Sequence, residues 1–148
     1  MEYFKSAVSQ TAGQSIRLYV HQSEDANLHE MFVVCMGSTY VRPNAHIGKD
    51  ESLHILEGAA DIILFDDKGE IFDVIELSDK LGHKNHFVRV PQEVYHTVAI
   101  RSEYLVMHQA TSGPFDKKDI NWASWAPTYD NHQGIIEYQN NLENQIQS

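Results

Sequence analysis

From Ser15 onward, apolar and polar residues alternate in short runs that turn residues separate. The runs are rich in Val, Ile, Tyr and Phe and are bounded by Gly, Asp, Asn or Pro, a pattern typical of β-strands. No helical segment long enough for a parallel crossover lies between them. The pattern predicts an all-β sandwich or closed barrel, with strands at residues 16–22, 30–36, 38–43, 52–58, 59–66, 70–77, 86–91, 96–101 and 104–110.

The turns and the two ends of the chain complete this prediction. Asp66 to Gly69 is the clearest hairpin turn, because glycine adopts a positive φ without steric cost. Residues 1–14 are weakly patterned, and we expect a short helix or an arm packed on the domain. We therefore predict a single domain over residues 1–148, with a barrel core of about 16–111 and a covering segment over 112–148.

The covering segment begins after Gly113-Pro114, where the strand pattern ends. We expect Trp122 and Trp125 to cover one end or one side of the barrel. Residues 134–148 have apolar positions at helical spacing, which is compatible with a short amphipathic helix. A frayed tail and a contact between copies are the alternatives.

Composition narrows the class of protein. No apolar run approaches the roughly 18 residues that span a bilayer, and the first residues lack the apolar stretch of a signal peptide, so we expect a cytoplasmic location without membrane contact. Cys35 is the single cysteine of the sequence, which excludes an internal disulfide and a cysteine-based zinc motif. Its neighbours are apolar, so we expect a buried, inert thiol.

The charge argues against one class of partner. The sequence has 21 acidic and 11 basic residues, a net charge of −10, and no basic run. Such a field repels the phosphates of nucleic acids. A small anionic substrate stays compatible, because nearby arginines can outweigh a distant net charge.

Two of the nine histidines and one glutamate are spaced for a metal site. Asn44 and His46 are two residues apart, so on an extended chain their side chains share one face. Glu51 begins the next strand, and His96 begins another after a turn. Since strands of a rolled barrel face one another across its interior, we expect His46, Glu51 and His96 to bind one divalent ion, of Zn, Fe, Mn or Ni type, with open positions. Two buried structural histidines and a solvated carboxylate are the alternative.

The residues around these ligands resemble the motifs of the cupin superfamily. NAHIGKDESLHILEG, residues 44–58, is similar to the first motif, in which His-x-His is followed by Glu and then Gly. PQEVYH, residues 91–96, resembles the second, in which a Pro-Gly turn precedes His. More narrowly, the chain resembles WbuC-type cupin-fold metalloproteins over about residues 16–127, in the segments TYVRPNAH, ESLHILEGAADIILFDDKGEI, VPQEVYHTVAI, SGPF and WASWAP.

This resemblance implies a jelly roll of two antiparallel sheets. We expect a homodimer, because small barrels often pair through exposed strands. The sequence departs from the family pattern at two positions. The family usually has His at the position of Asn44, which leaves Asn44 as a weak fourth ligand or a substrate contact. Glu93 stands where the second motif usually has Gly, so the turn must accept a side chain. Gln109 is expected in the pocket, because its equivalent in the family is typically a pocket glutamate.

Strand parity predicts where other side chains point. Tyr40 and Arg42 share the parity of His46, so both could face the cavity, where Arg42 could clamp a carboxylate or phosphate and Tyr40 could donate a proton. A surface salt bridge is the alternative for Arg42. His54 and Tyr95 are expected to face away from the ligands. We expect the histidines near loops and strand ends to be solvated, namely His21, His29, His83, His86 and His132.

Three functions fit these residues, and the sequence assigns no catalytic residue to any of them. The resemblance to WbuC-type proteins, which are associated with polysaccharide biosynthesis, favours a metal-dependent enzyme acting on a sugar or sugar nucleotide, as an isomerase or epimerase. The position of Asn44 favours a non-catalytic cupin that binds a metal or a small ligand. Open metal positions are also compatible with a non-haem iron dioxygenase.

Overall fold

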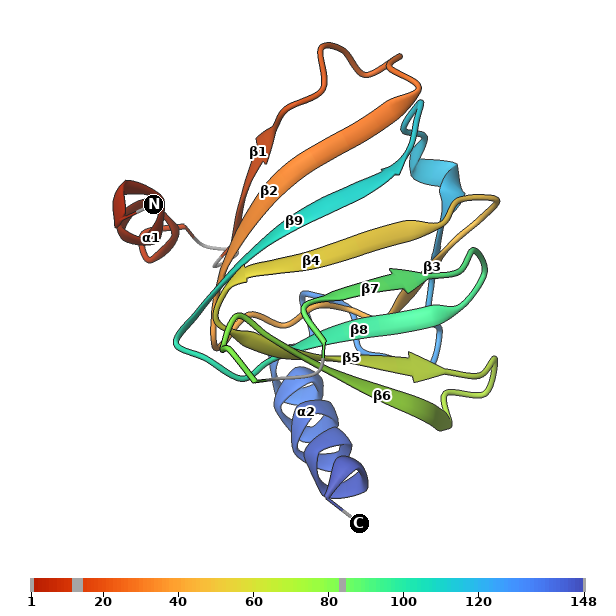
Figure 1. The fold of residues 1–148 in the computed structure, drawn as a ribbon. Coiled ribbons are helices and arrows are strands. Elements are labelled where there is room, and N and C mark those ends of the chain that lie inside the picture. Colours follow the sequence, from red (N-terminus) through yellow and green to blue (C-terminus); the bar gives the residue numbers. More distant parts are fainter. Residues whose placement is uncertain (1, 12–14, 83–84, 148) are drawn as a thin grey trace.

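The computed structural model describes residues 2–11, 15–82 and 85–147 and shows two antiparallel sheets of five strands each (Figure 1). The first sheet has the order β1-β2-β9-β4-β7, with β1 Ser15–Tyr19, β2 Leu28–Met36, β9 Tyr104–Ser112, β4 Glu51–Glu57 and β7 Phe87–Val90. The second has the order β10-β3-β8-β5-β6, with β10 Ile120–Trp122, β3 Asn44–His46, β8 Tyr95–Ile100, β5 Ala59–Phe65 and β6 Ile71–Ser78. The predicted all-β class is confirmed.

The core lies between the two sheets and follows the alternation along each strand. On β4, Glu51, Leu53 and Ile55 are buried, whereas His54 between them is exposed. The other sheet contributes residues such as Ile62 to the same cluster. Burial of these apolar side chains is the main force that holds the sheets together.

Cys35 lies in this core at 3% exposure. Burial raises the pKa of its thiol to about 11, although the nearby charge of Arg17 acts in the opposite direction. The predicted burial of this thiol is confirmed, and its raised pKa agrees with low reactivity.

The helices cover the outer faces of the sheets. Helix α1 (Glu2–Val8) packs on the first sheet through Val8, which contacts the cluster of Val34 and Val106. Helix α2 (His132–Ile146) lies against the second sheet, where Leu142 joins the cluster of Ile63 and Phe65 (Figure 1). A helix was one of the alternatives expected at each end of the chain, and a helix is observed at both ends. No helix among the described residues is long and apolar enough to cross a membrane.

The hairpin turn lies where the sequence predicts it. Gly69 has a φ of +87°, and β5 and β6 pair in antiparallel fashion on either side of the turn. The side chain of Asp66 accepts hydrogen bonds from the backbone N–H groups of Lys68 and Glu70. These bonds fix the turn that connects the two strands.

The predicted strand over residues 38–43 is wrong. These residues form a turn and an irregular segment, and β3 begins only at Asn44. Pro43 has no N–H to donate to a ladder. The segment instead contacts the C-terminal part of the chain: Tyr40 donates to the carbonyl oxygen of Pro127 at 3.0 Å, and Arg42 donates to that of Ala123 at 2.9 Å.

The C-terminal segment does more than cover the barrel. Residues Ile120–Trp122 form β10, which pairs in antiparallel fashion with β3. The edge of the second sheet next to the His46 strand therefore comes from residues that the sequence analysis placed outside the barrel core. Trp125 contacts Phe65 with its ring, in agreement with a covering role.

Candidate metal centre

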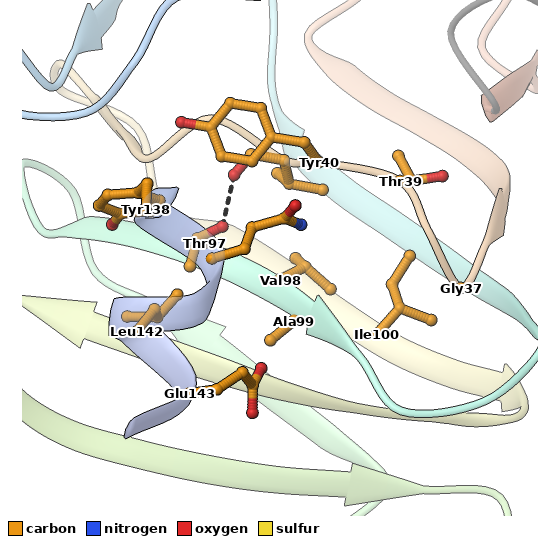
Figure 2. Close-up of a pocket in the computed structure, with 12 residues that line it drawn as sticks. Gly37, Thr39, Tyr40, Thr97, Val98, Ala99, Ile100, Tyr138, Leu142 and Glu143 are labelled. Atoms are coloured by element: carbon orange, nitrogen blue, oxygen red, sulfur yellow. Dashed lines mark hydrogen bonds between the residues drawn. The ribbon is translucent and has the colours of Figure 1, made fainter. Parts of the chain in front are cut away.

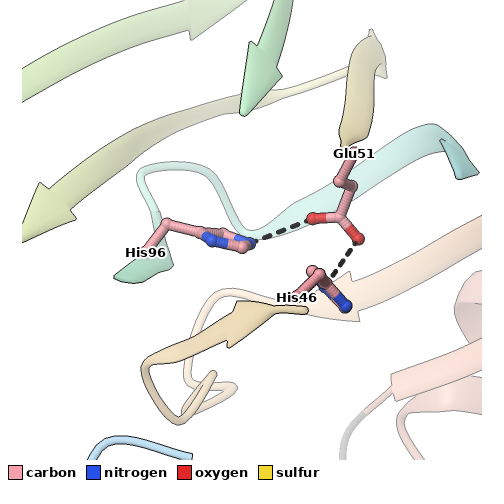
Figure 3. Close-up of side chains that lie close together, drawn as sticks. All are labelled: His46, Glu51 and His96. Atoms are coloured by element: carbon pink, nitrogen blue, oxygen red, sulfur yellow. Dashed lines mark hydrogen bonds and ion pairs between the residues drawn. The ribbon is translucent and has the colours of Figure 1, made fainter. Parts of the chain in front are cut away.

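His46, Glu51 and His96 come together from three strands of the two sheets. His46 ends β3, Glu51 begins β4 and His96 is the second residue of β8. Each ligand is therefore held by backbone that is hydrogen-bonded in a sheet. Figure 3 shows the Glu51 carboxylate between the two imidazole rings.

The distances suit a shared ion. One potential ligand atom from each residue lies within 4.8 Å of the other two. One carboxylate oxygen of Glu51 is 3.0 Å from Nε2 of His96, and the other is 3.3 Å from Nε2 of His46. Glu51 and His96 are each 4% exposed, so bulk water reaches neither freely. Two imidazoles and a carboxylate form a donor set for Zn, Fe, Mn or Ni.

The second ring nitrogen of His96 is fixed by the backbone. Its Nδ1 lies 3.1 Å from the carbonyl oxygen of Val94, and a carbonyl only accepts. Nδ1 therefore carries the proton, which leaves Nε2 as the nitrogen for a metal. Sequence reasoning missed this partner, because a backbone carbonyl has no residue type that marks it.

The pKa values of Glu51 and His96 are shifted in opposite directions. Burial disfavours the charge on Glu51, but hydrogen bonds from His46 and His96 outweigh it and lower the pKa of this carboxyl well below the ordinary 4.5. Burial also disfavours a charged His96, yet its hydrogen bond to Glu51 and the attraction of that carboxylate raise its pKa above the ordinary 6.5. Both shifts favour an ion pair between Glu51 and His96 when no metal is bound.

The turn before β8 aligns the two histidine strands. Glu93 has a φ of +63°, the left-handed region that Gly usually occupies. Its backbone N–H donates to the carbonyl oxygen of His46 at 2.8 Å. The turn thus accepts a side chain, as predicted, and links β3 to the start of β8.

Of the other predicted pocket residues, the structure brings Gln109 to the three ligands. Its side-chain amide donates to the Glu51 carboxylate. Asn44 is paired with His96 across the ladder, but its amide donates to the carbonyl oxygen of Arg42 at 3.1 Å. In this arrangement the Asn44 amide is engaged with its own backbone segment.

The structure does not bring Tyr40 and Arg42 to the metal centre. Tyr40 lines a cavity of about 110 Å³ between β8 and α2, together with Thr97 and Tyr138 (Figure 2). Arg42 lies with its guanidinium 5.5 Å from the ring centre of Trp122. Parity failed for both because they precede β3 and do not belong to a strand.

The remaining described histidines differ in exposure, and His108 is half-buried with its Nε2 3.4 Å from the Glu30 carboxylate. His54, His86 and His132 are exposed. His29 was expected to be solvated and is instead 4% exposed, because β2 begins at Leu28 and includes it. Its ring stacks on His21 with centroids 4.0 Å apart. His83 lies outside the described residues.

Comparison with known sequences finds one family. A family model described as "Domain of unknown function (DUF6016)" matches residues 4–77. No curated protein matches the sequence.

Three solved structures are similar to the chain at low identity. Protein SO0799 from Shewanella oneidensis is 13% identical with a TM-score of 0.67, over 92% of this chain and 94% of that one. KdgF from Halomonas sp. is 18% identical with a TM-score of 0.53, over 71% and 83%. Oxalate decarboxylase from Bacillus subtilis is 14% identical with a TM-score of 0.56, over 73% of this chain and only 27% of that one. These likenesses confirm the cupin jelly roll, whereas the narrower WbuC-type resemblance stays a prediction.

Proposed function

We propose that this chain, which belongs to the family described as Domain of unknown function (DUF6016), binds one divalent metal ion through His46, Glu51 and His96 and acts on a sugar or a related polyhydroxy compound. The observation that carries the proposal is the convergence of three ligand atoms within 4.8 Å from three separate strands. Such an ion would polarise a carbonyl or hydroxyl group of the substrate.

The residues around the ligands define what this chain contributes. The Val94 carbonyl keeps the proton of His96 on Nδ1, so that Nε2 would be the nitrogen that holds the ion. Gln109 orients the Glu51 carboxylate through its amide. We assign Gln109 the role of positioning this ligand, because its contact is with Glu51.

The class of substrate follows from the charges. Arg42, the arginine predicted to clamp a phosphate, donates to Ala123 on the C-terminal segment. The chain as a whole carries −10. Both observations favour a neutral or weakly charged polyhydroxy compound over a sugar nucleotide. The resemblance to WbuC-type proteins supports a sugar, with isomerisation or epimerisation as the reaction.

Asn44 favours a second candidate function, a cupin that binds a metal or small ligand without turnover. Its amide is hydrogen-bonded to the Arg42 carbonyl, so three side chains are left as the protein ligands. Fewer protein ligands give weaker coordination, which suits reversible binding.

Metal analysis of the purified protein tests the proposal. We expect one divalent ion per chain in the unaltered protein and none in His96→Ala, with the β-type circular dichroism spectrum retained. His54→Ala is the matched control, because this histidine is exposed and its ring points away from Glu51 on the same strand. Equal metal content in all three proteins would remove the site from consideration.

The bound metal and a ligand screen then separate the candidate functions. Turnover of a sugar that His96→Ala abolishes supports an enzyme. Metal-dependent sugar binding without turnover supports the binding protein. Iron with O₂ uptake supports an oxygenase and contradicts both.

A further inference from the structure

A second hollow lies on the outer face of the second sheet, behind the metal centre. Its volume is about 440 Å³, within the range of small-molecule sites. Its lining residues are Ala45, Ile47, Asp67, Glu93, Tyr95 and Asn121. Because neighbours on a strand alternate between faces, Ala45 and Tyr95 point away from the side occupied by His46 and His96.

Four of the residues that line this hollow have polar side chains, of which Asp67 and Glu93 are exposed to solvent. Asp67, Glu93, Tyr95 and Asn121 come from four different segments: the β5–β6 turn, the β7–β8 turn, β8 and β10. Among the residues that the structure describes, their side-chain polar atoms form no hydrogen bond or ion pair. Two carboxylates therefore border the hollow, and none of the residues that line it is basic.

The walls of the hollow are held in place from behind. The Trp125 ring contacts Tyr95 edge-on, with centroids 6.0 Å apart. The same ring lies so close to Gly69 that an added Cβ there would be 2.7 Å from it, which fixes the turn that carries Asp67. Glu93 is fixed by the hydrogen bond from its backbone N–H to His46. The Tyr95 ring and the backbone that carries Asp67 and Glu93 are thus held in place by the protein itself.

We infer that this hollow binds a small organic cation. An ammonium or guanidinium group would be attracted to the carboxylates of Asp67 and Glu93, and the Asn121 amide oxygen can accept from it. The Tyr95 ring offers a cation–π face, and Ile47, at 48% exposure, offers apolar surface for a short aliphatic chain. An anion would be repelled by both carboxylates and by the net charge of −10.

The direct test is a titration of the full-length, metal-free protein with three four-carbon probes, followed by NMR. The probes are putrescine, 1,4-butanediol and succinate, which share a chain length and differ in charge. We expect putrescine alone to shift the resonances of Tyr95, Asn121 and Ile47, with an affinity that falls as salt is added. Shifts that are the same for butanediol, or absent for putrescine, would overturn the inference.

Matched variants test the carboxylates themselves. Asp67→Asn and Glu93→Gln should each weaken putrescine binding about threefold, and the double variant about tenfold, as for exposed charge pairs. Glu70→Gln is the control, because it removes one charge from the same hairpin without lining the hollow. Equal weakening by the control would mean that the general field attracts the cation, and it would refute a specific site. Since no metal is present, neither result depends on the proposed metal centre.

Discussion

His96 is the residue on which the metal centre depends most closely. Its two ring nitrogens lie within hydrogen-bond distance of two acceptors, the Val94 carbonyl and the Glu51 carboxylate. An imidazole that donates from both nitrogens is charged. Burial opposes this charge, but the hydrogen bond to Glu51 and the attraction of its carboxylate stabilise it and raise the pKa of His96 above the ordinary 6.5. A metal ion, by contrast, requires neutral imidazole at Nε2.

Protons should therefore compete with the metal at His96. Below the raised pKa of His96 the ring is protonated, so apparent metal affinity should fall as the pH drops, and the fall should begin above pH 6.5. Metal binding in this range should release a proton. Competition titrations with a metal-sensitive dye, at pH values from about 5 to about 8, measure both effects. An affinity that is independent of pH over this interval would contradict histidine ligation.

Asn44 gives a second prediction for a single residue. It lies opposite His96 in the ladder and two residues before His46, so its side chain starts from the ligand-bearing face. In Asn44→His a ring nitrogen replaces an amide that is a poor ligand, and we expect metal binding to tighten about tenfold. Isothermal titration compares the variant with the unaltered protein. Asn44→Ala, which supplies no ligand, is the control and should bind no more tightly than the original.

Among the elements, α2 has a defined attachment to the second sheet. Leu142 is 7% exposed and packs on Ile63 and Phe65. Arg101 adds ion pairs to Asp61 and Glu143, at 2.6 Å each. The helix therefore packs on the sheet through an apolar contact centred on Leu142, to which Tyr138 and Ile146 of the same helix add.

Leu142→Ala should lower the free energy of unfolding by about 2 to 3 kcal/mol, because it leaves a cavity in a packed contact. Ile136→Ala is the matched control on the same helix, since Ile136 is 55% exposed and its truncation should change stability by about 0.5 kcal/mol or less. Urea unfolding measures both variants. A Leu142→Ala protein as stable as the control would show that α2 does not contribute to the core.

The strands also show how far sequence alone predicts this molecule. Alternation located the strands whose inner residues fill the core, such as β4 and β5, because burial of one face is a local pattern. The 38–43 segment has the same alternation. Its side chains, however, donate hydrogen bonds to the backbone carbonyls of Pro127 and Ala123, which lie more than 80 residues away in the sequence. No local pattern reports such contacts, and the same holds for β10, whose strand character depends on pairing with β3.

The candidate site was predictable to a similar extent. Because His46, Glu51 and His96 were expected at the ends of strands, the sequence was sufficient to predict that their side chains meet. Strand parity predicted neither the hydrogen bond of the Asn44 side chain nor the positions of Tyr40 and Arg42 away from the metal centre. These three side chains are placed by hydrogen bonds to backbone carbonyls, and any residue type supplies those.

At the scale of the whole molecule, the core and the metal centre are separable. The apolar cluster between the sheets includes Leu53, Ile62 and Leu105, whereas the three ligands lie at or next to the ends of their strands. Glu51 and His96 pair with each other when no ion is bound, so neither is left as an isolated buried charge. The barrel should therefore fold without metal, and the ion should add stability through binding alone.

Removal of the metal should lower the melting temperature without unfolding the barrel. At a free metal concentration of a hundred times Kd, binding adds about 2.7 kcal/mol, which corresponds to about 5 to 10 °C for a chain of this size. Thermal unfolding with and without a chelator measures the difference, and the β-type spectrum should persist after chelation. His54→Ala should retain the metal-dependent shift and His96→Ala should lose it. If chelation abolished the β-type spectrum, the ion would be part of the folding core, contrary to the separation of apolar cluster and ligands seen here.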